Sequence, residues 1–166
     1  MKILVIGYGN QSRQDDGAGW LVIERLTALG LPDVELQVAH QLEVDVAETV
    51  SRFDLVIFVD AAVSDVPLAV TRTVVRPNPE FRAVSHSMAP AEVLALCRTL
   101  YGKEPQGMLF SIRGEDFGFG MTVSPAVEDA ANEVVRMIVK EVRRSGISFD
   151  GLRTGSAATG AVCSLG

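Results

Sequence analysis

The chain has 166 residues, of which 48% are hydrophobic, enough for one domain with a full core and too few residues for two ordinary domains. Its 15 Lys and Arg are scattered among 21 Asp and Glu, with a formal net charge of -6, so nothing in the sequence favours nucleic-acid binding. No stretch approaches the roughly 18 apolar residues of a membrane span, and the N-terminal apolar run is too short for a signal peptide. We therefore expect a cytoplasmic protein that does not bind membranes.

Strands and helices alternate along the chain when it is examined for apolar periodicity. In chain order, the sequence predicts a strand at 2–6, a helix at 17–29, a strand at 34–38, a helix at 44–51, strands at 55–59 and 70–75, a helix at 90–100, a strand at 108–112 and a helix at 125–144. Three of the strands are continuously apolar, as in a parallel sheet buried on both faces, whereas AVTRTVV at 69–75 alternates and suits an edge. The predicted fold is a three-layer, doubly wound α/β sandwich with a mostly parallel five-stranded sheet and helices on both faces.

The last predicted helix has clear start and stop signals. Ser124 is a suitable N-cap and Pro125 occupies the first helical position. After Arg144 the composition changes to Gly, Ser, Ala and Thr. We expect a single α/β domain at 1–145 and a flexible C-terminal tail at 146–166.

The two cysteines do not form a disulfide framework by their spacing. Cys97 lies in an apolar helical pattern, and Cys163 lies far away near the C-terminal end of the sequence. Both are predicted to be free thiols in a reducing cytosol. Cys97 is also a poor nucleophile in the middle of a helix, and no G-x-S-x-G motif occurs.

Reactive side chains follow three of the predicted strands, at the sheet edge where ligands of open α/β folds bind. Asp15 and Asp16 close the loop after the first strand, Asp60 ends the run DLVIFVD, and His86 precedes the helix at 90–100. Each has a structural explanation, as a helix cap, a turn cap or an ordinary polar residue. Together, two carboxylates and one imidazole form a donor set that borderline divalent metals accept, with positions left for water or substrate. A metal site is therefore one interpretation beside the structural ones.

A nucleotide site is the other interpretation of the first loop, and the residues disfavour it. GYGNQS supplies Gly7 and Gly9 but places Ser12 at the third glycine of G-x-G-x-x-G, and Glu43 is a poor match for the acid after the second strand. The two aspartates of the loop would also repel a pyrophosphate. His40, after the second strand, either lines the same cleft or is an ordinary polar residue at a strand end.

The segments ILVIGYGN, DDGAG, DLVIFVDAA and SHSMAPAEVLAL resemble the family of nickel-iron hydrogenase maturation endopeptidases in their order and spacing. The resemblance runs from about residue 1 to residue 144 and includes SIRGEDFGFGMTVSP. It implies an endopeptidase that removes the C-terminal extension of a hydrogenase large-subunit precursor after nickel insertion. It also implies a monomer that docks on this precursor.

The resemblance assigns roles to individual residues. It implies that Asp16, Asp60 and His86 are both the metal ligands and the catalytic residues, acting on nickel that the precursor carries. Other divalent metals can occupy such a donor set in vitro. Asp15 is then a supporting or capping group beside the ligands. The residues that shape the first loop in the family correspond to Gly7, Gly9, Asn10 and Gly17.

Two departures from the family pattern bear on the substrate. Many relatives have glutamate where this chain has Asp16. The stretch after the second strand reads HQLEVDVAE, with His40, Gln41 and Leu42, and resembles the branch that serves soluble, bidirectional or NAD-linked hydrogenases. The resemblance leaves open whether nickel acts in recognition or as a Lewis acid, and it leaves the general base unassigned. The alternative function is a non-proteolytic metal sensor or chaperone for the large subunit.

Overall fold

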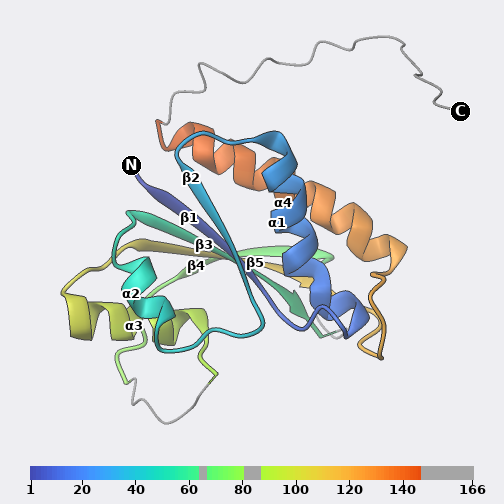
Figure 1. Ribbon diagram of the computed structural model, residues 1–166, viewed down its shortest axis with the longest axis horizontal. Helices are drawn as coiled ribbons and strands as arrows, with labels where there is room; N and C mark the ends of the chain where they lie inside the picture. Colours follow the sequence, from blue (N-terminus) through green and yellow to red (C-terminus); the bar gives the residue numbers. More distant parts are fainter. Residues whose placement is uncertain (64–66, 81–86, 147–166) are drawn as a thin grey trace, which may run out of the picture.

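The computed structural model of the chain describes residues 1–63, 67–80 and 87–146 (Figure 1). Its elements are β1 (Ile3–Tyr8), the short 3-10 helix η1 (Gln14–Gly17), α1 (Ala18–Leu29), β2 (Val34–Ala39), α2 (Val46–Val50), β3 (Leu55–Ala62), β4 (Val70–Val75), α3 (Pro90–Tyr101), β5 (Gln106–Arg113) and α4 (Pro125–Arg144). From residue 147 on, the predicted tail lies outside the described residues, and Cys163 lies there with it.

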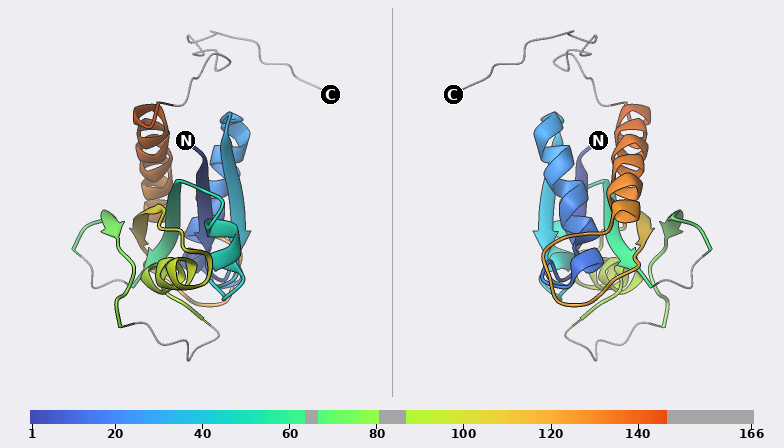
Figure 2. Two further views of the ribbon diagram at one scale, coloured as in Figure 1. Left: turned by 90° about the vertical axis from the view of Figure 1, so that its left-hand side faces the viewer. Right: turned by 90° about the vertical axis from the view of Figure 1, so that its right-hand side faces the viewer.

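The five strands form one sheet in the order β2-β1-β3-β5-β4. The first four are parallel, and β4 is antiparallel to β5 at the edge. Helices α1 and α4 lie side by side on one face, and α2 and α3 cover the other (Figures 1 and 2). The predicted three-layer sandwich with one non-parallel edge strand is confirmed.

Alternation of side chains along the strands builds a core on each face of the sheet. In β1, Ile3 and Val5 pack into the cluster under α1 and α4, whereas Leu4 and Ile6 pack into the cluster under α2 and α3. Because both faces are covered, every one of these positions must be apolar. This explains why the sequence of β1 shows no polar alternation.

Two glycines allow α1 to pack directly on the backbone of the sheet. A Cβ atom at Gly7 would lie 2.2 Å from the carbonyl oxygen of Gly19. A Cβ atom at Gly19 would lie 2.7 Å from the carbonyl oxygen of Val59 and 2.8 Å from the nitrogen of Tyr8. Since these are backbone atoms, neither glycine tolerates a side chain without a shift of the helix. The start of α1 is thereby held against the ends of β1 and β3.

The predicted apolar stripe of α4 is buried against the sheet: Val127, Ala131, Val134, Ile138 and Val142. Ser124 occupies the N-cap position, but its side chain makes no capping hydrogen bond. Its hydroxyl instead donates to Oδ2 of Asp15 at 3.0 Å. Ser124 is thus the N-cap residue, as predicted, but its hydroxyl bonds to a carboxylate from the other end of the chain instead of to the helix backbone.

The thiol of Cys97 is buried in the cluster under α3 and is free, as the sequence predicts for this residue. Burial raises the pKa of this thiol, which favours the unreactive protonated form. In the described part of the chain, no helix combines the length and apolar character needed to cross a membrane.

Candidate active site

The topological switch point of the sheet lies at the carboxyl ends of β1 and β3. From β1 the chain continues to β2 on one side and later returns to β3 on the other side. Ligands of open α/β sheets bind in the crevice that this reversal leaves. The turn after β1 leads into η1, which carries Asp16 there, and β3 carries Asp60 two residues before its end.

Asp16 is half-buried, and the turn folds back onto it. Oδ2 of Asp16 accepts a hydrogen bond from the backbone N–H of Asn10 at 2.6 Å. Gly9 has φ +137, and a Cβ atom there would lie 2.2 Å from the carbonyl oxygen of Asp16. At Gly17 there is more room, because an added Cβ atom would lie 3.5 Å from its nearest neighbour, the Cα atom of Gln11. Sterically, the turn requires Gly9 and tolerates a methyl group at Gly17.

Asp60 is half-buried beside two hydrogen-bond donors. Oδ1 accepts from the backbone N–H of Ala61 at 2.8 Å, and the hydroxyl of Tyr8 also donates to this carboxylate. Burial raises the pKa of Asp60 to about 6, against the effect of these two hydrogen bonds, and the negative charge of Asp16 raises it further. The pKa of Tyr8 is raised as well. Burial is the main cause, and the negative charge of Asp60 and the hydrogen bond to it add to the effect. The carboxylates of Asp16 and Asp60 are therefore close enough to interact.

Two of the three predicted ligands thus come together at one edge of the sheet. The third, His86, lies outside the described residues. Among the residues with a described position, no group of three or more His, Cys, Asp or Glu is arranged to hold a metal. Interacting carboxylates in a partly desolvated crevice are nonetheless stabilised by a cation. The donor chemistry of Asp16 and Asp60 fits a divalent metal.

Asp15 is fully buried and anchors the segment between β5 and α4. Its carboxylate accepts the backbone N–H of Glu115 at 2.8 Å, of Asp116 at 3.0 Å and of Ser124 at 2.6 Å, in addition to the Ser124 hydroxyl. Burial alone would raise the pKa of Asp15, but these hydrogen bonds outweigh burial and lower it. Asp15 therefore caps no helix of its own and supports Asp16 through the backbone.

No protein-family model and no curated protein matches the chain. Several solved structures are similar to the chain. The hydrogenase maturating endopeptidase HybD from E. coli is 23% identical over 88% of this chain and 94% of its own, with a TM-score of 0.70. The [NiFe] hydrogenase maturation protease HycI from Thermococcus kodakarensis is 25% identical over 86% and 92%, with a TM-score of 0.66. The hydrogenase 2 maturation peptidase from a Thaumarchaeota archaeon is 20% identical over 86% and 99%, with a TM-score of 0.66.

The chain has the fold of the nickel-iron hydrogenase maturation proteases. The sequence did not predict the contacts that the segment at 114–121 makes with the first loop. Its backbone joins the turn before η1, since Gln14 N–H donates to the carbonyl of Gly120 at 2.9 Å and Gly120 N–H donates to that of Ser12 at 2.9 Å. The guanidinium of Arg13 lies 4.8 Å from the ring centroid of Phe119. No local pattern could have signalled these pairs, because their partners are about a hundred residues apart.

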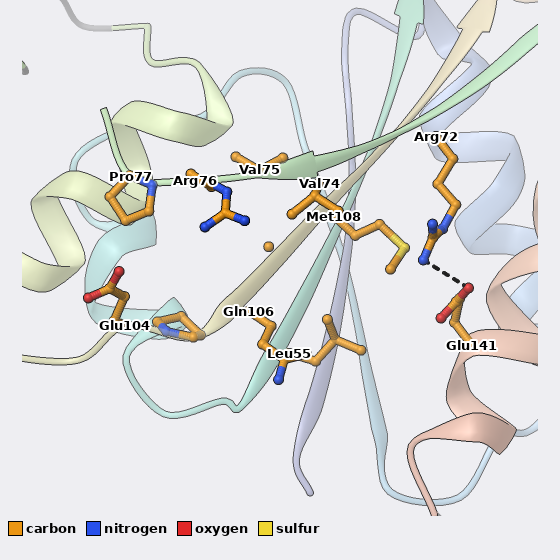
Figure 3. A pocket seen from close by; sticks show the side chains of 12 residues that line it. Leu55, Arg72, Val74, Val75, Arg76, Pro77, Glu104, Gln106, Met108 and Glu141 are labelled. Atoms are coloured by element: carbon orange, nitrogen blue, oxygen red, sulfur yellow. Dashed lines mark ion pairs between the residues drawn. The ribbon is translucent and has the colours of Figure 1, made fainter. Parts of the chain in front are cut away.

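Two further hollows are lined by neither Asp16 nor Asp60. His40, Gln41 and Glu43 line one of about 290 Å³ at the carboxyl end of β2, where the amide of Gln41 donates to Glu43 at 2.9 Å. The other, of about 440 Å³, lies beside β4 and contains the ion pair of Arg72 and Glu141 at 3.0 Å (Figure 3). It includes the first residues of β3 and β5, so it lies at the opposite end of the sheet from the switch point.

Proposed function

We propose that this protein is a hydrogenase maturation endopeptidase. It hydrolyses one peptide bond in the precursor of a nickel-iron hydrogenase large subunit and releases the C-terminal extension after nickel has been inserted. The juxtaposition of Asp16 and Asp60 at the switch point of this fold carries the assignment. The similar structures named as maturation proteases, one of them 25% identical, support it.

The nickel ion is part of the substrate in this function, since the precursor brings it. Asp16 and Asp60 offer oxygen ligands from two different segments, and His86 would add an imidazole nitrogen, as the family resemblance implies. The half-buried carboxylates of Asp16 and Asp60 repel each other, and a bound cation removes this repulsion. Precursor without nickel therefore binds less well at this edge of the sheet. The bound ion then positions the scissile bond, which couples cleavage to nickel loading.

The stretch after β2 supports a narrower substrate assignment. Because this stretch, HQLEVDVAE, resembles the branch that processes soluble or bidirectional hydrogenases, we assign this chain to that branch. Its His40 and Gln41 stand at the same sheet edge as Asp16. The protein acts as a monomer in the cytoplasm, where a free thiol such as that of Cys97 stays reduced.

Intact-mass analysis tests the function directly. Nickel-loaded and nickel-free precursors are incubated with the unsubstituted protein, with Asp16→Asn and Asp60→Asn, and with Asp33→Asn as a matched control at an exposed aspartate that precedes β2, at the opposite end of the sheet. Loss of a discrete C-terminal peptide is expected only from nickel-loaded precursor and only with the unsubstituted and control proteins. Binding without cleavage by the unsubstituted protein would contradict the endopeptidase and favour a metal-sensing chaperone. Normal cleavage by both site variants would remove Asp16 and Asp60 from the site.

A further inference from the structure

The segment at 114–121 presents large apolar side chains to solvent from a fixed backbone. Phe119 is 85% exposed and Met121 is 66% exposed. Single exposed apolar residues are common on protein surfaces. Here, however, the backbone between them is held on both sides, by the hydrogen bonds of Gly120 to Ser12 and Gln14. A preorganised apolar surface loses little conformational entropy when a partner binds to it.

A hollow of about 210 Å³ adjoins this segment. Its apolar lining comes from Leu21, Met121 and Val123, and its carboxylates come from Glu24 and Glu128. The volume is below the roughly 300 to 1,000 Å³ of small-molecule pockets, so it suits a single side chain.

The charges around the hollow favour a cationic side chain. Glu128 shares its carboxylate with Arg25. Glu24 is exposed, and within the described ranges of the chain it has no ion-pair partner. The nearby cation of Arg13 lies over the ring of Phe119. A mixed polar and apolar lining beside the Glu24 carboxylate matches lysine or arginine, whose stems are apolar and whose ends are charged.

We propose that Phe119, Met121 and this hollow form the docking surface for the hydrogenase large-subunit precursor. A Lys or Arg side chain of the precursor enters the hollow beside Glu24, and an apolar side chain packs on Phe119. The docking surface rests on the proposed function for the identity of its partner. The hollow lies near the candidate active site along the chain, because Gly17 lines the hollow and directly follows Asp16.

Binding and cleavage are measured separately to test this surface. Dissociation constants for purified nickel-loaded precursor are measured on full-length proteins that also carry Asp16→Asn, so that no precursor is cut. Phe119→Ala and Glu24→Lys are each expected to raise the dissociation constant by about tenfold or more, as truncation of a central interface residue does. The matched controls Leu100→Ala, at a side chain that is 60% exposed, and Glu133→Lys, at an exposed glutamate, are expected to stay within about twofold.

The outcomes separate this surface from the endopeptidase function. If the unsubstituted protein cuts the precursor and both variants bind as tightly as the controls, the docking surface is wrong and the function stands. If the protein binds without cutting and the variants bind weakly, the surface stands and the function is wrong. Absence of any binding would overturn both. A dimer in sedimentation that Phe119→Ala dissociates would overturn the surface as well, since a second copy would then be its partner.

Discussion

The carboxylate of Asp15 accepts two hydrogen bonds from Ser124, one from the backbone N–H at 2.6 Å and one from the hydroxyl at 3.0 Å. The two residues are 109 positions apart in the sequence. This pair ties η1 to the start of α4, and Asp16 follows Asp15 directly. The position of a candidate metal ligand thus depends on the last helix of the fold.

Removal of the Asp15 carboxylate is expected to destabilise the protein strongly. Asp15→Ala leaves the backbone N–H groups of Glu115, Asp116 and Ser124 without their acceptor. At about 1 to 3 kcal/mol for each unsatisfied buried group, partly relieved by water, we expect a loss of about 3 kcal/mol or more in the free energy of unfolding. Urea denaturation measures it. Asp45→Ala is the control, and a loss below about 1 kcal/mol in Asp15→Ala would contradict the anchoring role.

Asp60→Asn is expected to stabilise the metal-free protein at neutral pH while it abolishes cleavage. The pKa of Asp60 is raised to about 6, so the folded state holds this proton more tightly than the unfolded state does. Stability from this group therefore falls as pH rises from about 4 to about 6 and stays low above that. Asparagine stays uncharged and keeps an oxygen that can accept the N–H of Ala61. Discounted for partial exposure, the expected gain is on the order of 1 to 2 kcal/mol at pH 7.5 and close to zero at pH 4.

Urea denaturation of both proteins at the two pH values measures this difference. Destabilisation by Asp60→Asn at pH 7.5 would mean that the ionised carboxylate contributes favourably to the fold, against the burial of this group.

Tyr8→Phe is expected to shift the acid limb of the cleavage rate to higher pH. The Tyr8 hydroxyl donates to Asp60 and lowers its pKa, so removal of this hydroxyl raises the pKa further. A carboxylate that must be ionised to bind a metal is then protonated over a wider pH range. The pH dependence of the initial cleavage rate measures the shift, with Tyr101→Phe as the control at a tyrosine that is 41% exposed. An unchanged limb would show that protonation of Asp60 does not limit the rate.

Alanine substitutions at two neighbouring glycines are expected to differ widely in their effect on stability. Gly19→Ala forces a methyl group against the backbone of Val59 and Tyr8, which overpacks the contact between α1 and the sheet. We expect a loss of about 3 kcal/mol or more in the free energy of unfolding. Gly17→Ala, whose new methyl meets only ordinary contacts, should change stability by less than about 1 kcal/mol. Equal losses in the two variants would point to backbone entropy instead of close packing.

Local sequence patterns determined most of the fold and part of the candidate site. Continuously apolar runs predicted the buried strands, and the predicted helix at 125–144 agrees with α4 at both ends. Asp16 and Asp60 could be placed at one edge because parallel strands bring their carboxyl ends together. The partners of Asp15 could not, since they lie in a segment about a hundred residues away that shares no pattern with the first loop. The contact of Tyr8 with Asp60 depends on the register of β1 against β3, which the sequence does not give. His86 stays a prediction, because its position lies outside the described residues.

The anchoring of Asp15 also has a consequence for the order of events at the ribosome. Residues 115, 116 and 124, which complete the turn around Asp16, leave the ribosome long after β1 and α1. A nascent chain that ends before them contains both carboxylates but lacks the groups that fix the first one. The turn that carries Asp16 is therefore held in place only when most of the chain has been made, so an unfinished chain lacks an ordered candidate site.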